Sequence, residues 1–195
     1  MYEYFEGAVA ELTPTYAVID AVGVGYMINI SLQTFSAIGN ASRTKLFTHY
    51  IVREDAHILY GFATREEREL FRLLIGVSGV GGNTARMILS SFKADELSNI
   101  IYNEQAQILK TVKGLGLKTA QKIIVELKDK VQGITISTEA KEQVATDNEI
   151  LSEGVSALTM LGFTRAASEK VLRQIFKEKP SISIEDAIRA ALKRL

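Results

Sequence analysis

Two short glycine-containing segments hold the residues of this sequence whose types and spacing best suit chemistry. Gly79-Val-Gly-Gly-Asn-Thr-Ala-Arg-Met-Ile-Leu89 aligns without gaps with Gly114-Leu-Gly-Leu-Lys-Thr-Ala-Gln-Lys-Ile-Ile124, at an offset of 35 residues. Each copy follows an apolar stretch with helical spacing and opens another one. We interpret each copy as a tight hairpin between two helices, repeated once along the chain.

The pattern Gly-hydrophobic-Gly predicts an anion site built mainly from backbone. Its glycines can adopt φ > 0 and allow the backbone to approach another molecule closely. The middle residue, Val80 or Leu115, is expected to plug the hairpin into the core. The following Thr-Ala begins a helix whose free N–H groups and positive dipole end face outward. Two such sites could hold two phosphates, one on each strand of a duplex.

A single Gly-x-Gly before a helix is most often an ordinary loop. Here the whole helix–hairpin–helix frame is repeated, and this repetition favours DNA-backbone binding. A nucleotide-binding loop is set aside, since that motif needs glycine directly before its lysine and a strand before the loop. Here Leu117 precedes Lys118, and a helical stretch precedes the loop. The candidate backbone-binding residues are Gly79, Val80, Gly81, Gly82, Asn83, Thr84, Arg86, Gly114, Leu115, Gly116, Leu117, Lys118, Thr119 and Lys122.

Residues 1–62 read as β-structure that precedes these hairpins. Short β-branched or aromatic segments, separated by glycine or polar clusters, predict strands over 4–9, 17–22, 26–30, 45–52 and 57–62, with an interruption from Leu32 to Ile38. A five-stranded closed barrel of the OB type fits this pattern, and a small open sandwich fits nearly as well. Its aromatic residues are expected to fill the barrel rather than to stack on bases; they are Tyr2, Tyr4, Phe5, Phe47, Tyr50, Tyr60 and Phe62.

The remaining chain reads as two helical regions joined by a linker. Residues 63–132 predict an all-α domain that carries both helix-hairpin-helix units, and residues 149–195 predict a bundle of three helices. Residues 133–148 are polar and without clear periodicity, which is typical of a flexible linker. The fold class is therefore multidomain α+β.

Charge is unevenly distributed although the net charge is zero. Residues 1–62 hold 3 Lys/Arg against 6 Asp/Glu, whereas residues 63–132 hold 11 against 8. The helical domain is thus the plausible place for phosphate.

The composition also excludes several kinds of site. The chain has no cysteine, and its two histidines, His49 and His57, lack a third metal ligand, so we expect no metal site of these residues and no cofactor. The sequence leaves open whether the hairpins hold a monovalent cation. The N-terminus does not resemble a signal peptide, and no apolar run approaches the roughly 18 residues of a membrane span, so a cytoplasmic protein without membrane contact is expected.

The sequence resembles the RuvA family, the Holliday-junction-binding subunits of the bacterial branch-migration complex, over its full length. The most specific strings are Val52-Arg-Glu-Asp-Ala-His-Ile-Leu-Tyr-Gly-Phe62 and Ile123-Ile-Val-Glu-Leu-Lys-Asp-Lys130. The resemblance implies a homotetramer with fourfold symmetry, one or two per junction, on which a four-way DNA junction lies flat. It implies roles in recombination and in DNA repair during the SOS response.

The resemblance also assigns roles to two other parts of the chain. It assigns Glu54 and Asp55 to an acidic pin that repels phosphates as strands separate. It implies that the C-terminal bundle docks onto the hexameric AAA+ motor subunit RuvB, with Leu161, Gly162 and Phe163 as candidate contacts. A junction resolvase is a further implied partner. The chain itself is expected to catalyse nothing and to serve as the accessory subunit of an ATP-driven motor.

Two departures from the family pattern concern charge. The family's first hairpin commonly reads Gly-Val-Gly-Pro-Lys, whereas Gly82 and Asn83 stand here. Its second hairpin often carries two basic residues, and Leu117 replaces one of them, with Arg86 and Lys122 as candidate substitutes. Each missing phosphate-neutralising lysine should lower the slope of log K against log salt by roughly 0.9.

Two other function classes remain open on the sequence. One is a helix-hairpin-helix nuclease or glycosylase, although no convincing catalytic acid–lysine pair or metal cluster is found. The other is a general duplex-binding or protein-interaction module, which a preference for junctions over plain duplex would exclude.

Overall fold

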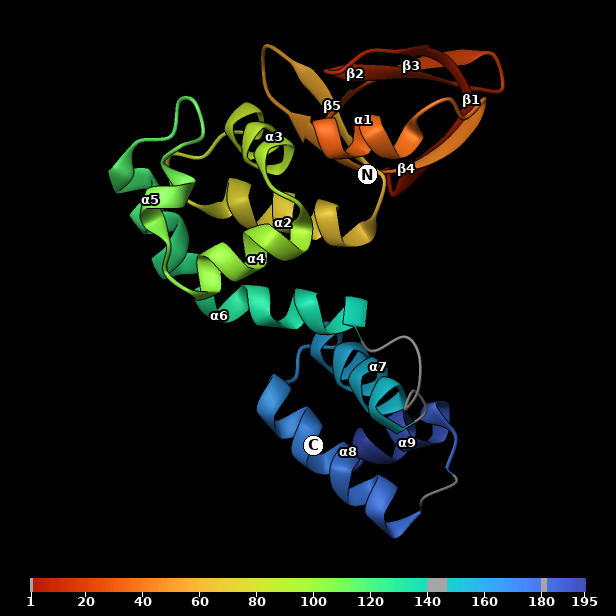
Figure 1. The fold of residues 1–195 in the computed structure, drawn as a ribbon. Coiled ribbons are helices and arrows are strands. Elements are labelled where there is room, and N and C mark those ends of the chain that lie inside the picture. Colours follow the sequence, from red (N-terminus) through yellow and green to blue (C-terminus); the bar gives the residue numbers. More distant parts are fainter. Residues whose placement is uncertain (1, 140–146, 180–181) are drawn as a thin grey trace. The chain divides into compact units, whose positions relative to one another are not determined.

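The computed structural model describes residues 2–139, 147–179 and 182–195, with the side chains of 132–139 and 147–150 left out. The chain divides into two compact units, residues 1–137 and residues 138–195. Unit 1 contains the predicted barrel and both hairpins, and unit 2 contains the predicted C-terminal bundle (Figure 1).

Five strands in residues 2–62 close into a barrel with the order β1-β2-β3-β5-β4. The strands are β1 (Tyr4–Leu12), β2 (Tyr16–Ala21), β3 (Val24–Ile30), β4 (Arg43–Val52) and β5 (His57–Phe62). Neighbours are antiparallel except β3 and β5, which run parallel. The barrel core consists of the inward strand residues Phe5, Ala17, Ile19, Ile28, Ile30 and Leu46, with Ile38 from the segment between β3 and β4. The prediction of a closed five-stranded barrel is confirmed.

The predicted interruption between the third and fourth strands is a helix, α1 (Leu32–Ile38). Its N-cap is Ser31, whose hydroxyl accepts a hydrogen bond from the Thr34 N–H at 3.0 Å. Gly39 ends the helix with φ 52°, a conformation that suits glycine. The residue types at both ends thus explain why this segment leaves the barrel as one short helix.

The helical domain of unit 1 consists of α2 (Arg65–Gly76), α3 (Gly82–Ser91), α4 (Ala94–Tyr102), α5 (Ala106–Leu109) and α6 (Leu117–Glu139). Its core also takes in two residues of β5, because the Tyr60 and Phe62 rings lie 4.8 and 4.9 Å from the ring of Phe71. The last barrel strand therefore belongs to both cores, and barrel and helices form one compact unit.

The aromatic residues of the barrel region are divided between three surroundings, and only part of this set fills the barrel as expected. Phe5 lies in the barrel core, whereas Tyr60 and Phe62 lie in the core of the helical domain. Tyr2 and Tyr4 are about half exposed. The reason is that β5 faces the helices on one side, so its large rings pack there.

The segment predicted as a linker is partly helical. Helix α6 continues to Glu139, seven residues into the segment 133–148, and α7 (Asp147–Met160) begins before its end. Once a helix is nucleated, each added residue gains a hydrogen bond at low entropic cost, so weak helix formers after Val131 do not stop it. Residues 140–146 of the predicted linker lie outside the described residues.

Unit 2 contains three helices in its described residues, as predicted. Helices α7, α8 (Arg165–Glu178) and α9 (Ile184–Ala191) enclose a small apolar core. The core consists of Val155, Leu158, Leu172, Ile175, Ala187 and Ala191. Among the residues that the structure describes, no helix has both the length and the apolar character needed to cross a bilayer.

Candidate nucleic-acid interface

Both predicted hairpins form the same turn. The Val80 N–H donates to the Val77 carbonyl at 3.0 Å, and the Leu115 N–H donates to the Val112 carbonyl at 3.0 Å. The third residue of each turn is a glycine with positive φ, 91° at Gly79 and 85° at Gly114. This is the geometry of a type II turn, which requires glycine at its third position. The sequence repeat is therefore also a repeat of backbone conformation and hydrogen bonding.

The hydrophobic residue of each hairpin, which we call its plug, is buried in the core. Val80 and Leu115 are each 5% exposed and belong to the same apolar core. Both hairpins are thereby fixed to one body, with their glycines on the outside. A Cβ atom added at Gly79, Gly81, Gly114 or Gly116 would meet no atom of the described part of the chain within 4 Å. These four positions are open to a ligand that approaches the backbone.

A helix begins directly after each turn. The Ala85 N–H donates to the Gly81 carbonyl and the Ala120 N–H to the Gly116 carbonyl, both at 2.9 Å. Among the described residues, no side chain caps α3, whose N-cap is Gly81. The amides of the first turn are then available to an anion, and the helix dipole favours negative charge there.

The first hairpin is tied to the barrel. Gly82 lies against β5 so closely that an added Cβ atom would fall 2.6 Å from the Tyr60 hydroxyl. The Tyr60 hydroxyl also donates to Asn83 Oδ1 at 3.5 Å. Burial raises the pKa of Tyr60, and the positive charges of Arg86 and Arg53 oppose that rise. The residues that replace the family's usual pair at 82 and 83 therefore sit at a close contact between barrel and hairpin.

Arg86 lies at this contact and faces the barrel. Its Nη1 atom donates to the Thr15 carbonyl at 2.7 Å and to the Ile30 carbonyl at 3.4 Å. The sequence suggested Arg86 as a substitute for a lost lysine of the first hairpin. The structure gives its guanidinium another partner, the backbone at the ends of two barrel strands.

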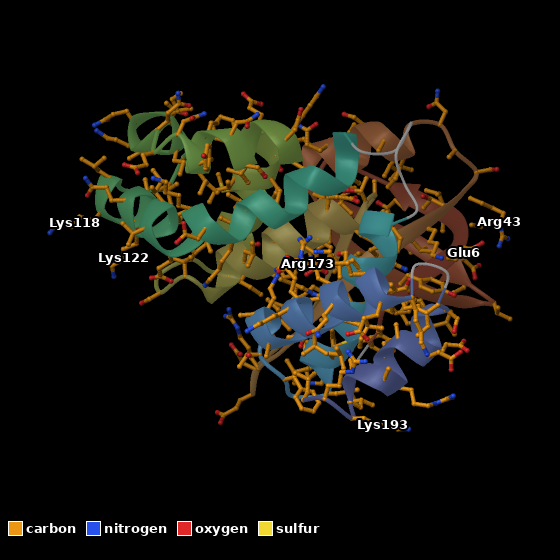
Figure 2. The ribbon with its side chains drawn as sticks, turned by 90° about the horizontal axis from the view of Figure 1, so that it is seen from below. Glu6, Arg43, Lys118, Lys122, Arg173 and Lys193 are labelled. Atoms are coloured by element: carbon orange, nitrogen blue, oxygen red, sulfur yellow. The ribbon has the colours of Figure 1, made fainter. Side chains whose placement is uncertain are left out.

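The second hairpin carries free positive charge instead. Lys118 and Lys122 are exposed, and their spacing of four residues places them on one face of α6. Figure 2 shows both lysines on the same side of this helix, directed away from it. Two further exposed lysines, Lys110 and Lys113, precede the turn. Sequence comparison of the two repeats missed Lys110 and Lys113 because they lie before the aligned segment; counting charge around each turn would have found them.

An ion pair links α6, the helix that follows the second hairpin, to the segment between α4 and α5. Lys128 of α6 donates to Glu104, which lies between α4 and α5. The hydrogen bond from Lys128 lowers the pKa of Glu104, and the same pair raises the pKa of Lys128. The two side chains are 40% and 61% exposed, so water screens the pair and its contribution to stability is small.

The acidic residues Glu54 and Asp55 lie at the tip of the hairpin that joins β4 to β5. The Arg53 N–H donates to the Ala56 carbonyl at 2.8 Å and closes this turn. Glu54 and Asp55 are both exposed. The structure therefore places the two carboxylates at the end of a strand pair, just before the strand β5 whose Tyr60 contacts the first hairpin.

In unit 2, the turn after α7 gives the candidate motor-contact residues Leu161 and Phe163 different surroundings. Gly162 has φ 99°, and the Phe163 N–H donates to the Leu158 carbonyl at 3.1 Å. This glycine-terminated helix end turns Phe163 back onto the bundle core. Leu161, by contrast, is 60% exposed and its neighbour Met160 is 88% exposed. Of the three candidate contacts, Leu161 is the exposed apolar one, and Met160 is a candidate that the sequence analysis missed.

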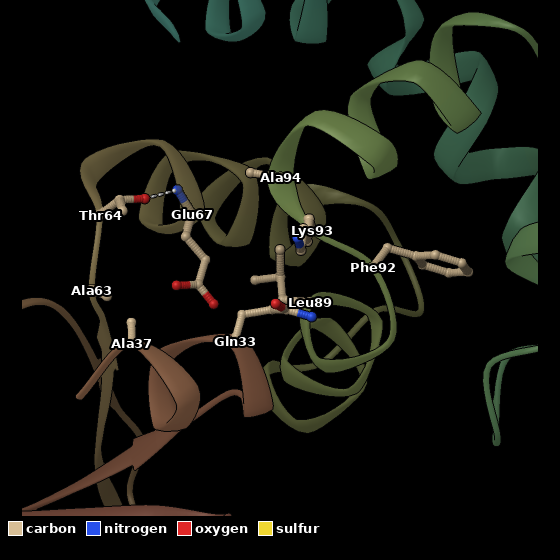
Figure 3. Close-up of a pocket in the computed structure, with 9 residues that line it drawn as sticks. All are labelled: Gln33, Ala37, Ala63, Thr64, Glu67, Leu89, Phe92, Lys93 and Ala94. Carbon is tan, nitrogen blue, oxygen red and sulfur yellow. Dashed lines mark hydrogen bonds between the residues drawn. The ribbon is translucent and has the colours of Figure 1, made fainter. Parts of the chain in front are cut away.

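A small cavity lies where α1, α2 and the end of α3 meet. Its volume is about 140 Å³, below the range of typical ligand pockets. Figure 3 shows the Glu67 carboxylate directed from α2 toward α1. Burial raises the pKa of Glu67, and hydrogen bonds from Ser31 and Thr34 oppose that rise. The cavity is lined by Gln33, Ala37, Ala63, Thr64, Glu67, Leu89, Phe92, Lys93 and Ala94.

Family models match three parts of the chain. Residues 1–61 match the RuvA N terminal domain, residues 71–129 match the SAM-like helix-hairpin-helix tandem, and residues 149–195 match the RuvA C-terminal domain. The middle match covers both hairpins, which is independent support for reading them as a tandem.

Curated relatives match the chain from end to end. Proteins of Bacteroides fragilis and Bacteroides thetaiotaomicron are 52% and 53% identical to it over 201 residues, and each alignment covers 100% of both chains. A protein of Porphyromonas gingivalis is 49% identical over 202 residues, again with 100% of both covered. All three are named Holliday junction branch migration complex subunit RuvA. With about half of its residues identical to these relatives over its whole length, the chain belongs to the RuvA family.

Proposed function

We propose that this chain binds four-way DNA junctions through their backbone phosphates and serves branch migration in recombination and repair. The observation that carries the proposal is the second hairpin, which repeats the turn, the plug and the helix start of the first. One such site would hold a phosphate on any duplex. Two such sites on one compact unit can hold phosphates on both strands of one arm without reading bases. The relatives' name supports the junction as the substrate.

The proposed assembly is a homotetramer, because a four-way junction has four equivalent arms and each chain carries one pair of hairpins. In this assembly the Glu54 and Asp55 loops of four chains would lie near the symmetry axis. Carboxylates close to phosphates repel them, and four copies near one axis strengthen that repulsion. Their role is to keep the strands at the crossover apart while base pairs exchange.

The proposed role of unit 2 is to dock onto the hexameric AAA+ motor of the complex in the cytoplasm. The bundle is a compact unit of its own with an exposed apolar pair, Met160 and Leu161, at the end of α7. Apolar side chains this exposed on a small bundle are suited to a protein contact. Motion of the DNA is then driven by the motor's ATP hydrolysis, and this chain contributes binding and position.

The test is a competition experiment. A labelled four-way junction is bound to the full-length protein and challenged with excess linear duplex of the same sequence, with and without magnesium. We expect the junction to stay bound and uncut. Equal competition by the duplex would show a general duplex binder, and cleavage of the junction would show an enzyme.

The acidic loop is tested by the double variant Glu54→Gln/Asp55→Gln in the same experiment. Because repulsion at the crossover is lost, the variant should bind the junction at least as tightly as the wild type. Branch migration with the motor should become less efficient. A weaker affinity of the variant for the junction would contradict the assigned repulsive role.

A further inference from the structure

Three consecutive residues where β3 meets α1 each share a hydrogen bond with the helical domain. The Ile30 carbonyl accepts from Arg86, and the Ser31 hydroxyl donates to Glu67. The Leu32 N–H donates to the Ser90 hydroxyl oxygen at 3.1 Å. These contacts, which we name the clasp, join Ile30, Ser31 and Leu32 of the barrel to Arg86, Glu67 and Ser90 of the helices.

Arg86 is half-buried and hydrogen-bonds the barrel backbone at two points, one of which belongs to the clasp. Its Nη1 atom makes the shorter of its two contacts, 2.7 Å, with the Thr15 carbonyl just before β2. Its Nε atom is buried and has no hydrogen-bond partner among the described residues. Its own carbonyl accepts from the Ser90 hydroxyl at 2.8 Å, which links the two α3 residues of the clasp. Because Arg86 is the one Lys or Arg between residues 73 and 92, the first hairpin has no other cation of its own.

The clasp acts on the same helix that begins at the first hairpin. Gly82, the first residue of α3, already touches Tyr60 of β5, and β5 starts right after the acidic loop. Arg86 and Ser90 lie one and two turns further along α3 and hold it to the ends of β3 and α1 and to the chain before β2. The position of the first hairpin relative to Glu54 and Asp55 is thereby fixed at several points.

We propose that Arg86 is a positioning residue, which acts through the clasp to fix the first hairpin relative to the acidic loop and thereby favours four-way junctions over linear duplex. This inference rests on the proposed function. A linear duplex needs only the local geometry of the hairpins. A junction must lie on the hairpins while its crossover surrounds the acidic loop, so a displaced first hairpin brings phosphates closer to the carboxylates and weakens junction binding selectively.

The alternative role for Arg86 is a direct phosphate contact, and the two roles differ in salt dependence. Removing a phosphate-neutralising side chain lowers the slope of log K against log salt by about 0.9 and weakens binding to all DNA. Removing a positioning residue lowers junction affinity and leaves the slope and the duplex affinity unchanged.

The experiment compares three variants of the full-length protein with the wild type on a four-way junction and on linear duplex, at several salt concentrations. Arg86→Met removes the guanidinium. Ser90→Ala removes, without a change of charge, the acceptor of the Leu32 N–H and the hydroxyl that donates to the Arg86 carbonyl. Lys122→Met is the matched control, since it removes an exposed charge on the second hairpin's helix. Thermal unfolding establishes that each variant is folded.

We expect Arg86→Met and Ser90→Ala to lower junction affinity about tenfold, the equivalent of about one hydrogen bond, with duplex affinity and both slopes unchanged. Lys122→Met should lower duplex affinity and the slopes. A lower slope and weaker duplex binding for Arg86→Met, or unchanged junction binding for Ser90→Ala, would overturn this inference and leave the proposed function standing. A wild type that binds both DNAs equally would overturn the proposed function as well.

Discussion

The two hairpins share a backbone and differ in almost everything around it. The turn hydrogen bonds have the same length in both, and the two plugs are equally buried. The first hairpin is held by the barrel through Tyr60 and Arg86 and has no exposed lysine of its own between residues 73 and 92. The second is flanked by exposed lysines at 110, 113, 118 and 122.

The difference indicates a division of labour within one repeated motif. A hairpin fixed to the barrel determines where a phosphate lies relative to the acidic loop. A hairpin rich in lysine supplies attraction that does not depend on an accurate position, because charge acts over several ångströms. We expect the first hairpin to contribute geometry and the second to contribute most of the salt-dependent affinity.

The largest expected effect comes from removing the plug of the less supported hairpin. Leu115→Ala should reduce the free energy of unfolding by about 2–5 kcal/mol, because it leaves a cavity in the core. Val80→Ala removes fewer atoms from a hairpin that the barrel also holds, so its loss should be smaller. Urea unfolding and duplex affinity measure both variants. A larger loss for Val80→Ala would reverse the comparison.

A buried carboxylate on the barrel side should make stability depend on pH. Because the folded-state pKa of Glu67 lies above its ordinary value of 4.5, its contribution to stability is fully present below that value. The contribution is lost as the pH rises through the folded-state pKa. Glu67→Gln keeps the size and an acceptor but not the charge, so its stability relative to the wild type should rise with pH over this range.

Glu67→Ala provides the matching truncation. It leaves the hydroxyls of Ser31 and Thr34 without their acceptor and should cost about 1–3 kcal/mol. Unfolding measured from pH 4 upward tests both variants. Parallel stability curves for the wild type and Glu67→Gln would show that this carboxylate does not titrate in the folded protein as expected.

The charge difference between the hairpins can be reduced by one substitution. Asn83 is exposed and makes one long hydrogen bond, 3.5 Å, so Asn83→Lys should leave the fold intact. It adds a cation where the first hairpin has none free. The slope of log K against log salt should steepen by about 0.9 for each further phosphate that the new lysine neutralises. An unchanged slope would place phosphate out of reach of this hairpin.

The smallest effect is expected from the ion pair between Lys128 and Glu104. Glu104→Gln removes the charge that Lys128 pairs with and should shift the unfolding midpoint slightly, less so at high salt. Since pairing lowers the pKa of Glu104, its contribution is present above its ordinary pKa and is lost as the pH falls. A large midpoint shift that persists at high salt would show that Glu104 supports the hairpin by packing.

Much of this architecture was predictable because local signals agree with the fold. Alternation of apolar residues indicated the strands, and the glycines at 79 and 114 are at the positions where the turn requires positive φ. The helix ends were less predictable. Helix α6 runs past Val131 through residues with weak helix propensity, because propagation from an established helix overrides local preference.

The environment of the site residues was not predictable from local pattern. Nothing in the string around Arg86 shows that its guanidinium meets carbonyls 56 and 71 residues away. Phe163 and Leu161 are neighbours of similar character, and the glycine between them sends one inward and leaves the other exposed. Such contacts depend on how distant segments pack, which a repeat alignment cannot contain.

The measurement that tests the division of labour most directly is the salt dependence of junction binding after the second hairpin has lost its charge. In the variant Lys110→Gln/Lys113→Gln/Lys118→Gln/Lys122→Gln the backbone of both hairpins is unchanged. We predict that the slope of log K against log salt falls by about 0.9 for each phosphate that is no longer neutralised, and loses most of its wild-type value. A slope that stays at the wild-type value would contradict this prediction, because the attraction would then come from elsewhere in the molecule.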